Sequence, residues 1–344
     1  TNLCWIALTA VVFTVVTVLI NAGLLGSYYQ ITLYNICINI ILAVSLNLII
    51  GICGQFSLGH AGFMCIGAYS AAIMVKSMPN MGGFAIGIVI GLIISAIAAL
   101  IVSIPTLRLR GDYLAIATLG FAEIIRAIFQ WDKLGAITNG SNMLHQFPSF
   151  SSFNIRNAQG EVVVYLSTLV PFVIAGVCIA LIVLLINSTY GRALKAIRDD
   201  ETAAEAMGVN LFHHKQLAFC ISSFFAGIGG AMLAMYACTV QAKSFTSAMT
   251  YEILLIVVLG GVGSITGSCL SAFLFVACSE WWLRFLDNTY TIGSFQVPLL
   301  RNGFRLVVFS VIIMVVVLFF RKGIMGEREL PDLLHGRKGK EAAK

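Results

Sequence analysis

The sequence contains few charged residues. Only 10% of its 344 residues are Asp, Glu, Lys or Arg, whereas 59% are hydrophobic. A soluble globular domain carries about 25% charged residues, because these side chains cover its surface. A chain of this length with so few charges lacks the side chains for a soluble surface, while a lipid-facing surface needs none. The composition therefore predicts an all-α integral membrane protein, a bundle of helices that crosses the bilayer repeatedly.

The chain also lacks the usual motifs of nucleotide binding, hydrolysis and metal binding. It has no GxxxxGK[ST] phosphate loop, no HExxH motif and no Ser/His/Asp set. Its nine cysteines form no CxxC pair and have no zinc spacing with histidine. The longest expected loop, 131–161, is too short for a catalytic domain. We therefore expect no enzyme activity, no metal and no cofactor bound by this chain.

Long apolar segments are abundant. Because a helix needs about 20 apolar residues to cross a bilayer, we expect spans at 3–20, 31–50, 56–75, 84–104, 113–130, 162–186, 215–237, 264–283 and 304–320. We interpret 3–20 as a retained span, since no convincing small-residue cleavage site follows it.

The distribution of Lys and Arg among the segments outside the spans constrains the number of spans. Segments 105–112, 187–215 and 321–344 hold 2, 4 and 7 Lys or Arg residues, 13 of the 21 in the chain. Cytoplasmic loops carry such an excess, so all three should face the cytoplasm, and the formal charge of +6 requires no nucleic-acid partner. Segments 187–215 and 321–344 share a side only if an even number of crossings separates them. Only three full spans, 215–237, 264–283 and 304–320, lie between these two segments, and three is an odd number.

The missing crossing is predicted at YEILLIVVLGGVGS, residues 251–264. This stretch is too short for a full span and ends in a glycine cluster, Gly260, Gly261 and Gly263. We expect a short helix that enters from outside, breaks at these glycines and returns through 265–283, because broken helices are tolerated where they are buried in protein or line a cavity. A single long helix with a kink at the glycines is the alternative.

Ten crossings with both termini inside follow from the broken helix. The transmembrane domain then covers residues 1–320, and residues 321–344 form a basic cytoplasmic tail. A stripe of small residues at every fourth position lies in one span: Gly83, Gly87, Gly91, Ser95, Ala99 and Ser103. Such a groove lets another helix approach closely, either from the same chain or from a partner subunit.

Ionisable groups inside spans are costly and are therefore functional candidates. Glu123 and Arg126 are spaced for pairing on one helix face. The pair either anchors the helix near its outer end or lines a substrate path, where an acid and a base would suit a zwitterion.

A second polar cluster lies in GQFSLGHAGF, residues 54–63, which contains Ser57 and His60. This turn into a helix either presents N–H groups and small polar side chains to a ligand or is a capped tight turn. Asn35 and Asn39 share a face of the preceding span, where hydrogen bonding between helices is favoured. The candidates for a substrate path are Ser57, His60, Glu123, Arg126 and Asn39.

Charge is concentrated in GRALKAIRDDETAAEAMGVN, residues 191–210, where seven of twenty residues are charged. A basic stripe runs through Arg192, Lys195 and Arg198, and Lys195–Asp199 and Arg198–Glu201 have pairing spacings. The opposite face is apolar, with Leu194, Ile197, Ala204, Met207 and Leu211, and Gly208 supplies a helix stop. The pattern predicts a short amphipathic helix that ends in a turn. By charge alone, a solvated loop helix would explain it.

The order of residues favours a further interpretation. Ala203-Ala204-x-x-x-Gly208 resembles the cytoplasmic "EAA" loop of ABC importer permeases, a short helix that fits a groove on the ATPase, although Thr202 stands where that loop has Glu. The residues that the resemblance assigns to ATPase coupling are Arg192, Lys195, Arg198, Asp199, Glu201, Ala203, Ala204 and Gly208.

A resemblance to one family extends over nearly the whole chain. The blocks LNLIIGICGQFSLGHAGFMCIGAYSAA (46–72), RGDYLAIATLGFAEIIRAI (110–128), GRALKAIRDDETAAEAMGVN (191–210) and ILLIVVLGGVGSITG (253–267) look like the LivM-type branched-chain amino-acid ABC transporter permease in order and spacing. Urea-type ABC permeases share these blocks, so an importer of urea or amides is an alternative.

The resemblance implies an importer subunit in the bacterial plasma membrane that works by alternating access. Its partners would be a second, LivH-like permease, two cytoplasmic LivG/LivF-like ATPases that bind ATP and Mg²⁺, and an extracytoplasmic binding protein for leucine, isoleucine or valine. A secondary transporter is a rival, but it usually needs an acidic ion site deep in the bilayer, and Glu123 already has a potential partner. A membrane scaffold would not require polar clusters at span breaks.

Overall fold

The computed structural model describes residues 27–109, 111–156, 162–287, 291–292, 295–296, 304–319, 323–326 and 329. The predicted span at 3–20 and most of the predicted tail lie outside these residues. The helices are α2 (Ser27–Asn47), α3 (His60–Ser77), α4 (Met81–Thr106), α5 (Asp112–Gln130), α6 (Gly135–Thr138), α7 (Leu166–Asn187), α8 (Thr189–Asp199), α9 (Glu201–Ala206), α10 (Leu211–Ala237), α11 (Ser247–Gly260), α12 (Ile265–Val276) and α13 (Phe304–Phe319).

Short irregular elements complete the described chain. The π-helical turns Leu48–Ile52 and Ala277–Trp282 continue α2 and α12, and 3₁₀ turns lie at Asp132–Leu134, Phe150–Phe153, Ala242–Ser244 and Arg284–Asp287. Strands β1 (Ile155–Arg156) and β2 (Val162–Val164) form an antiparallel pair, as do β3 (Thr291–Ile292) and β4 (Phe295–Gln296). Apart from these two small ribbons, the described fold is helical, as the composition predicts.

Several helices are suited to crossing a membrane. Within the described residues, five are long and apolar enough: Ile31–Ile52, Met81–Thr106, Leu166–Asn187, Leu211–Ala237 and Ile265–Trp282. Helices Asp112–Gln130 and Asp132–Thr138, bent by 54°, make a sixth if they are one span, and α11 and α13 are apolar but shorter. A polytopic helical membrane protein is thus confirmed, whereas ten crossings stay a prediction.

The span expected at 56–75 begins later than the apolar pattern indicated. Residues 54–59 are not helical, and α3 starts at His60. The chain turns at Gly54, whose φ of +74° lies in the left-handed region. From there α3 is buried around almost its whole circumference, because it packs against α10, α4 and α5. A helix that is apolar on all sides is typical of this central position.

The stripe of small residues on α4 faces helices of the same chain. A side chain at Gly87 would meet Ala71 and Met74 of α3, and one at Gly91 would meet Gly67 of α3. Farther along the stripe, Ser95 and Ala99 are fully buried. Opposite the stripe, α4 exposes Ile86, Val89, Ile93, Ile97 and Ile101. The alternative left open by the sequence is therefore settled in favour of an internal contact.

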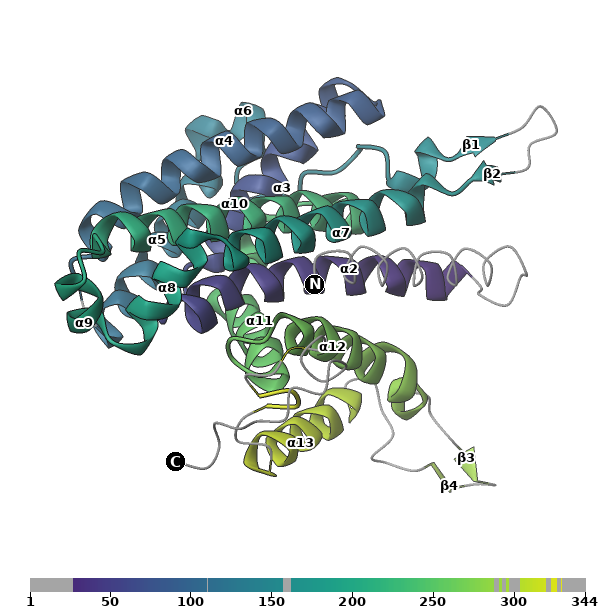
Figure 1. Cartoon of the computed structure of the whole chain (residues 1–344). Helices are drawn as coiled ribbons and strands as arrows, with labels where there is room; N and C mark the ends of the chain where they lie inside the picture. Colours follow the sequence, from purple (N-terminus) through teal and green to yellow (C-terminus); the bar gives the residue numbers. More distant parts are fainter. Residues whose placement is uncertain are drawn as a thin grey trace.

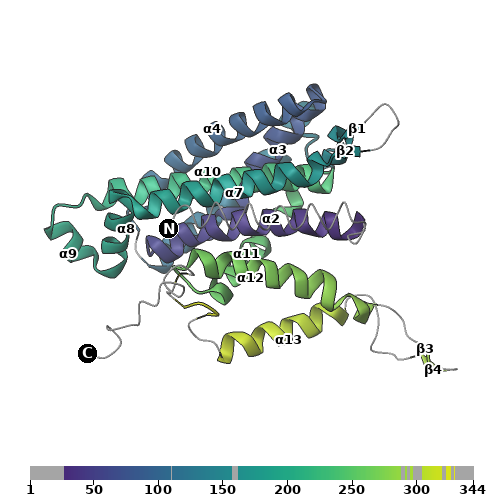
Figure 2. The ribbon, with the colours of Figure 1, turned by 45° about the vertical axis from the view of Figure 1, so that its right-hand side comes forward.

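Helix α2 lies between two groups of helices. Figures 1 and 2 show it with α7, α10, α3 and α4 on one side and α11, α12 and α13 on the other. It contacts α7 and α10 in the first group and α11 and α12 in the second. Because its core-facing residues are almost completely buried, with Ile38, Ile41 and Leu46 at most 1% exposed, α2 joins the two groups into one body.

Candidate functional site

The charged stretch 191–210 folds as two short helices rather than the single helix expected. Helix α8 ends at Asp199, and α9 runs from Glu201 to Ala206. Asp200 interrupts the helix because its side chain accepts hydrogen bonds from the backbone N–H groups of Thr202 (2.8 Å) and Ala203 (3.1 Å). This is an N-cap, which favours an extended backbone at Asp200 over a helical one.

One face of this segment rests on the membrane-spanning helices. Leu194 and Ile197 of α8 and Ala204 of α9 are at most 4% exposed, as the amphipathic pattern predicts. Met207 was assigned to the same face, but it is 85% exposed, because the helix ends before it and Gly208 turns the chain with φ of +85°. The segment therefore presents a large apolar side chain outward beside its charges.

The opposite face is exposed. Arg192, Lys195, Asp199, Glu201 and Ala203 all belong to it, whereas Arg198 is half-buried. The predicted pairs Lys195–Asp199 and Arg198–Glu201 are not those observed. Arg198 pairs with the adjacent Asp199, at 2.9 Å between Nη2 and Oδ1, and Glu201 pairs with Lys215 of α10, at 2.6 Å.

Arg198 instead reaches into the protein. Its Nη1 donates a hydrogen bond of 3.1 Å to the carbonyl of Gly51, in the π-helical turn after α2. A Cβ added to Gly263 would lie 3.3 Å from the same Nη1. The exposed basic stripe therefore lacks Arg198. This residue instead connects the charged segment to the π-helical turn after α2, and it lies beside Gly263 of the glycine cluster.

The glycine cluster interrupts the chain between α11 and α12. Helix α11 ends at Gly260, and α12 begins at Ile265. The turn requires glycine, since φ is +112° at Gly261 and +95° at Gly263. A side chain at Gly261 would also lie 2.5 Å from the carbonyl oxygen of Gly326. The two helices are separate elements that pack on each other, not one long kinked helix.

Asn47 of α2 forms hydrogen bonds with the residues of this break. Its Oδ1 accepts from the N–H of Gly263 (2.8 Å), and its Nδ2 donates to the carbonyl of Ser264 (2.8 Å) and to Oγ of Ser268 (2.9 Å). Asn47 is 1% exposed. A buried amide with all these partners fixes the position of the break relative to α2.

Residues 324, 325 and 329 also form hydrogen bonds with the residues that flank the break. Ile324 and Met325 donate backbone hydrogen bonds to the carbonyls of Leu259 (2.9 Å) and Gly260 (3.1 Å). The carboxylate of Glu329 accepts from the N–H groups of Ile265 (2.7 Å) and Thr266 (3.1 Å), at the start of α12. A carboxylate at a helix N-terminus is stabilised by the helix dipole.

Ser57 and His60 lie inside the protein, and each is at most 4% exposed. The Nε2 atom of His60 is 2.9 Å from Oγ of Ser45 on α2. The turn before His60 is held by the N–H of Leu58, which donates to Oγ1 of Thr118 on α5 (3.1 Å). These contacts enclose both candidates between α2, α3 and α5.

Glu123 and Arg126 form an ion pair on α5, as their spacing predicts. The two side chains are 36% and 30% exposed, respectively. Nε of Arg126 is buried without a hydrogen-bond partner among the described residues. The pair thus lies at the edge of the helix bundle, apart from the enclosed His60.

Asn39 lines a cavity of about 440 Å³ between α2, α10, α11, the end of α12 and α13. Its Nδ2 donates to the backbone carbonyl (3.0 Å) and the side chain (3.1 Å) of Asn35. The same cavity is lined by two carboxylates, Glu252 of α11 and Glu280. Apolar walls are provided by Ile38, Leu42, Leu233, Ile253, Phe275 and Phe309. The cavity combines acceptors for a positive charge with space for an apolar side chain.

Glu252 and Glu280 are not among the residues predicted from the sequence to line a substrate path. Glu252 lies in the apolar run YEILLIVVLGGVGS. An acidic residue within a membrane segment is a functional candidate, so the sequence contained a signal that indicates Glu252. Glu280 follows an apolar run and accepts a hydrogen bond from Tyr28 (3.0 Å). The cavity forms only when α2, α10, α11, the end of α12 and α13 pack together, so no local pattern in the sequence indicates it.

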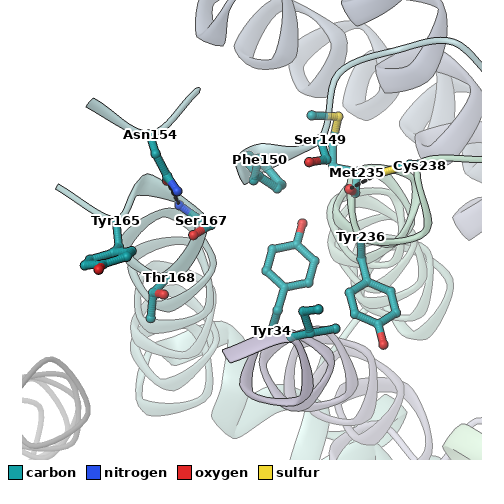
Figure 3. Close-up of a pocket in the computed structure, with 11 residues that line it drawn as sticks. Tyr34, Ser149, Phe150, Asn154, Tyr165, Ser167, Thr168, Met235, Tyr236 and Cys238 are labelled. Carbon is teal, nitrogen blue, oxygen red and sulfur yellow. Dashed lines mark hydrogen bonds between the residues drawn. The ribbon is translucent and has the colours of Figure 1, made fainter. Parts of the chain in front are cut away.

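A second cavity, of about 430 Å³, lies at the end of the bundle opposite α8 and α9. Figure 3 shows Tyr34 at its centre, between Ser167 and Thr168 on one side and Tyr236 on the other. The rings of Tyr34 and Tyr236 are stacked with centroids 5.4 Å apart, and the Tyr34 hydroxyl donates to the carbonyl of Met232 (2.8 Å). None of the lining residues is charged.

Comparison with known proteins gives consistent matches. The family described as branched-chain amino acid transport system / permease component matches residues 28–320. Two relatives named high-affinity branched-chain amino acid transport system permease protein LivM, from Salmonella typhimurium and Escherichia coli, are 35% identical over an alignment of 275 residues. The alignment covers 74% of this chain and 63% of each relative. A probable branched-chain amino acid transport permease protein LivM from Methanocaldococcus jannaschii is 23% identical, over 83% of this chain and 80% of the relative.

The chain thus spans less than two thirds of the length of the first two relatives. No solved structure matches it significantly. The family match, in contrast, covers α2 to α13, including the charged segment, the glycine break and both cavities. The chain belongs to the family of permease components of branched-chain amino acid transport systems.

Proposed function

We propose that this chain is a membrane-spanning subunit of an ATP-driven importer of leucine, isoleucine and valine in the bacterial plasma membrane. The names of its relatives support the substrate class. The observation that carries the mechanism is the segment of α8 and α9, which buries one face on the bundle and exposes the other. ATP and Mg²⁺ are bound by separate cytoplasmic ATPases, for which this segment is the contact surface.

The coupling step follows from the contacts of Arg198. When the ATPases close on ATP, they push α8 and α9, and Arg198 carries this movement to Gly51 and Gly263. The glycine turn at Gly260, Gly261 and Gly263 acts as the hinge between α11 and α12. Alternating access needs an element with two positions that contacts both partners. A short anchored segment beside a glycine turn meets this requirement.

The cavity beside Asn39 is our candidate for the substrate path. Glu252 would accept the ammonium group of an amino acid, and the apolar wall with Leu42 and Phe275 would hold its aliphatic side chain. The Glu123–Arg126 pair is the second candidate, along α5. Ser57 and His60 support the turn before α3 in this conformation, since both are enclosed in the core.

The topology proposed is ten crossings, with a transmembrane domain over 1–320 and a cytoplasmic tail over 321–344. The break between α11 and α12 supports the additional crossing. The partners are a second, LivH-like permease, two LivG/LivF-like ATPases, an extracytoplasmic binding protein and the surrounding lipid. The binding protein delivers the amino acid at the end of the bundle opposite α8 and α9.

Reconstitution tests this function. The chain is co-purified with its partners, placed in proteoliposomes with the binding protein, and assayed for ATP hydrolysis and uptake of radiolabelled leucine. We expect uptake that requires ATP and that valine and isoleucine inhibit. Uptake of urea without uptake of leucine would favour a urea importer, and leucine uptake without ATP hydrolysis would favour a secondary transporter.

The double variant Arg192→Glu, Arg198→Glu tests the coupling surface. Charge reversal removes the contact of Arg198 with Gly51 and places negative charge on the exposed face, so we expect ATP hydrolysis to persist while leucine uptake falls at least tenfold. Membrane insertion, measured by the amount of protein in the membrane fraction, should not change. Uptake equal to that of the wild type would contradict the assignment of this segment.

A further inference from the structure

A third cavity lies beside the charged segment, and its lining points to a ligand. It has a volume of about 370 Å³ and is enclosed by residues 54–56, the turn between α4 and α5, the first residue of α9 and the start of α10. Ligand pockets in proteins typically have volumes of about 300–1,000 Å³. The cavity is separate from the one beside Asn39, because the two share no lining residue.

Gln55 is the unusual member of this lining. It is only 5% exposed, yet neither Nε2 nor Oε1 has a hydrogen-bond partner among the described residues. A buried amide group without a hydrogen-bond partner destabilises the folded protein. Both atoms are covered in this conformation. If the side chain turned toward the cavity, it would offer one donor group and one acceptor, which a ligand with both an acceptor and a donor would satisfy.

An ion pair lies at the same cavity. Nζ of Lys215 is 2.6 Å from Oε1 of Glu201, with 14% of the Lys215 side chain and 48% of the Glu201 side chain exposed. A lysine ammonium has three donors and a carboxylate about four acceptor sites, so the pair retains capacity for a carboxylate and an ammonium from a ligand. Phe56 and Leu114 add apolar surface beside these charges.

We propose that this cavity binds a free α-amino acid with an apolar side chain from the cytoplasm, and that the bound amino acid inhibits the transporter. Lys215 and Nε2 of Gln55 hold the carboxylate, Glu201 and Oε1 of Gln55 hold the ammonium group, and Phe56 and Leu114 contact the side chain. This inference rests on the proposed function, which places the charged segment in the cytoplasm and makes such amino acids the imported product.

The position of the cavity gives the inhibition a physical basis. Gly54 lines the cavity, and a Cβ added there would lie 3.1–3.4 Å from Cγ, Cα and Cβ of Arg198. Glu201 is the first residue of α9, and Lys215 lies in the second turn of α10. A ligand that bridges Gln55, Glu201 and Lys215 would hold the charged segment against residues 54–56. The segment would then resist the movement that ATP drives.

The experiment uses the complete transporter in proteoliposomes, with ATP supplied only outside. Complexes whose ATPases face outward then hydrolyse ATP, and added L-leucine reaches their cytoplasmic side. We expect leucine to reduce hydrolysis in the wild type. The variant Gln55→Met, which keeps the volume and removes both polar groups, should raise the half-inhibitory concentration at least tenfold, equivalent to about 1.4 kcal/mol.

Gln130→Met is the matched control, because Nε2 of Gln130 is also buried without a partner among the described residues but does not line this cavity. It should leave the inhibition unchanged. Equal inhibition of the wild type and Gln55→Met, or no inhibition of the wild type, would overturn the proposal.

Two analogues test the recognition of a zwitterion. Leucinamide lacks the carboxylate and 4-methylpentanoate lacks the ammonium group, so each should inhibit at least tenfold less strongly than leucine. If either is as effective as leucine, the assigned contacts are wrong. Equilibrium dialysis of radiolabelled leucine against the purified complex, wild type and Gln55→Met, reports on this site without transport. A complex that shows Gln55-dependent binding but no ATP-driven uptake would contradict the proposed function alone.

Discussion

Arg198 shows how a single side chain can act differently from its neighbours in the sequence. Its spacing from Arg192 and Lys195 places it in a basic stripe, yet it bonds to Gly51, 147 residues away. The absence of a side chain at Gly54 and Gly263 leaves room for it. Sequence periodicity describes which face a residue occupies on its own helix, but a contact with a distant carbonyl depends on the tertiary fold.

The carboxylates of the cavity beside Asn39 were missed for the same reason. Glu252 and Asn39 are more than 200 residues apart, and their proximity results from the packing of α2 against α11. Glu123 and Arg126, in contrast, are local partners, and their pairing was predicted correctly. Spacing on one helix can indicate such a pair, although Asp199 of α8 pairs with the adjacent Arg198 and not with Lys195. A cavity formed by several helices cannot be inferred from spacing.

The first prediction concerns Glu252. The variant Glu252→Gln removes the negative charge but keeps the shape, so an amino acid loses a charge-assisted hydrogen bond worth about 1.5–3 kcal/mol. We expect the KM for leucine uptake to rise at least tenfold while leucine-independent ATP hydrolysis persists. Kinetics of leucine uptake in proteoliposomes measure this change.

Glu123→Gln is the comparison, because it alters the other acidic candidate on α5. A raised KM in Glu123→Gln together with an unchanged KM in Glu252→Gln would place the substrate path along α5 and contradict the assignment of the cavity.

Elements were predicted with more success than contacts. The apolar runs indicated most of the long helices, and the glycines at 260–263 indicated where α11 ends, because positive φ values favour glycine. The charged segment differed from the prediction, because it forms two helices, α8 and α9, instead of one. Asp200 can cap a new helix at its own position, and the periodic pattern of charges concealed this break between α8 and α9.

The glycine break gives the second prediction. In Gly261→Ala, the residue would adopt φ of +112°, which is costly for any residue with a Cβ, and its methyl group would lie 2.5 Å from the carbonyl oxygen of Gly326. We expect the midpoint of thermal unfolding to fall by several degrees and ATP-driven uptake to decrease more than tenfold.

Gly82→Ala provides the control, since Gly82 lies in α4 with open space around its Cα and alanine favours a helix by about 1 kcal/mol. It should be as stable as the wild type or more so. A Gly261→Ala protein with unchanged stability and uptake would show that the break tolerates a side chain.

At the scale of the whole molecule, composition was the most informative property. A charged fraction of 10% is sufficient to assign the chain to the membrane, and the family match extends over most of its length. The number of crossings is harder to obtain, because α11, α13 and the bent pair α5–α6 are each shorter than a bilayer requires or interrupted.

The third prediction tests the orientation of the molecule. Single cysteines are introduced into a variant whose nine native cysteines are replaced by serine. One is placed at Ala203, on the exposed face of α9, and the other at Ser152, at the opposite end of the bundle; both residues are exposed. In intact cells, a membrane-impermeant maleimide should label Ser152→Cys and not Ala203→Cys. Permeabilised cells supply the control, in which both are labelled. Labelling of Ala203→Cys from outside would reverse the proposed topology.

Photo-crosslinking from Met207 tests whether the segment of α8 and α9 contacts the ATPase. This side chain is 85% exposed beside the charges of α9, so a benzoylphenylalanine in its place should attach covalently to the ATPase subunit when the complete transporter is irradiated. The same photoreactive residue at Val173, which is 52% exposed on the membrane-spanning helix α7, should give no ATPase adduct. We expect an ATPase adduct from Met207 and none from Val173. Irradiated complexes in which Met207 yields no adduct with the ATPase would contradict it.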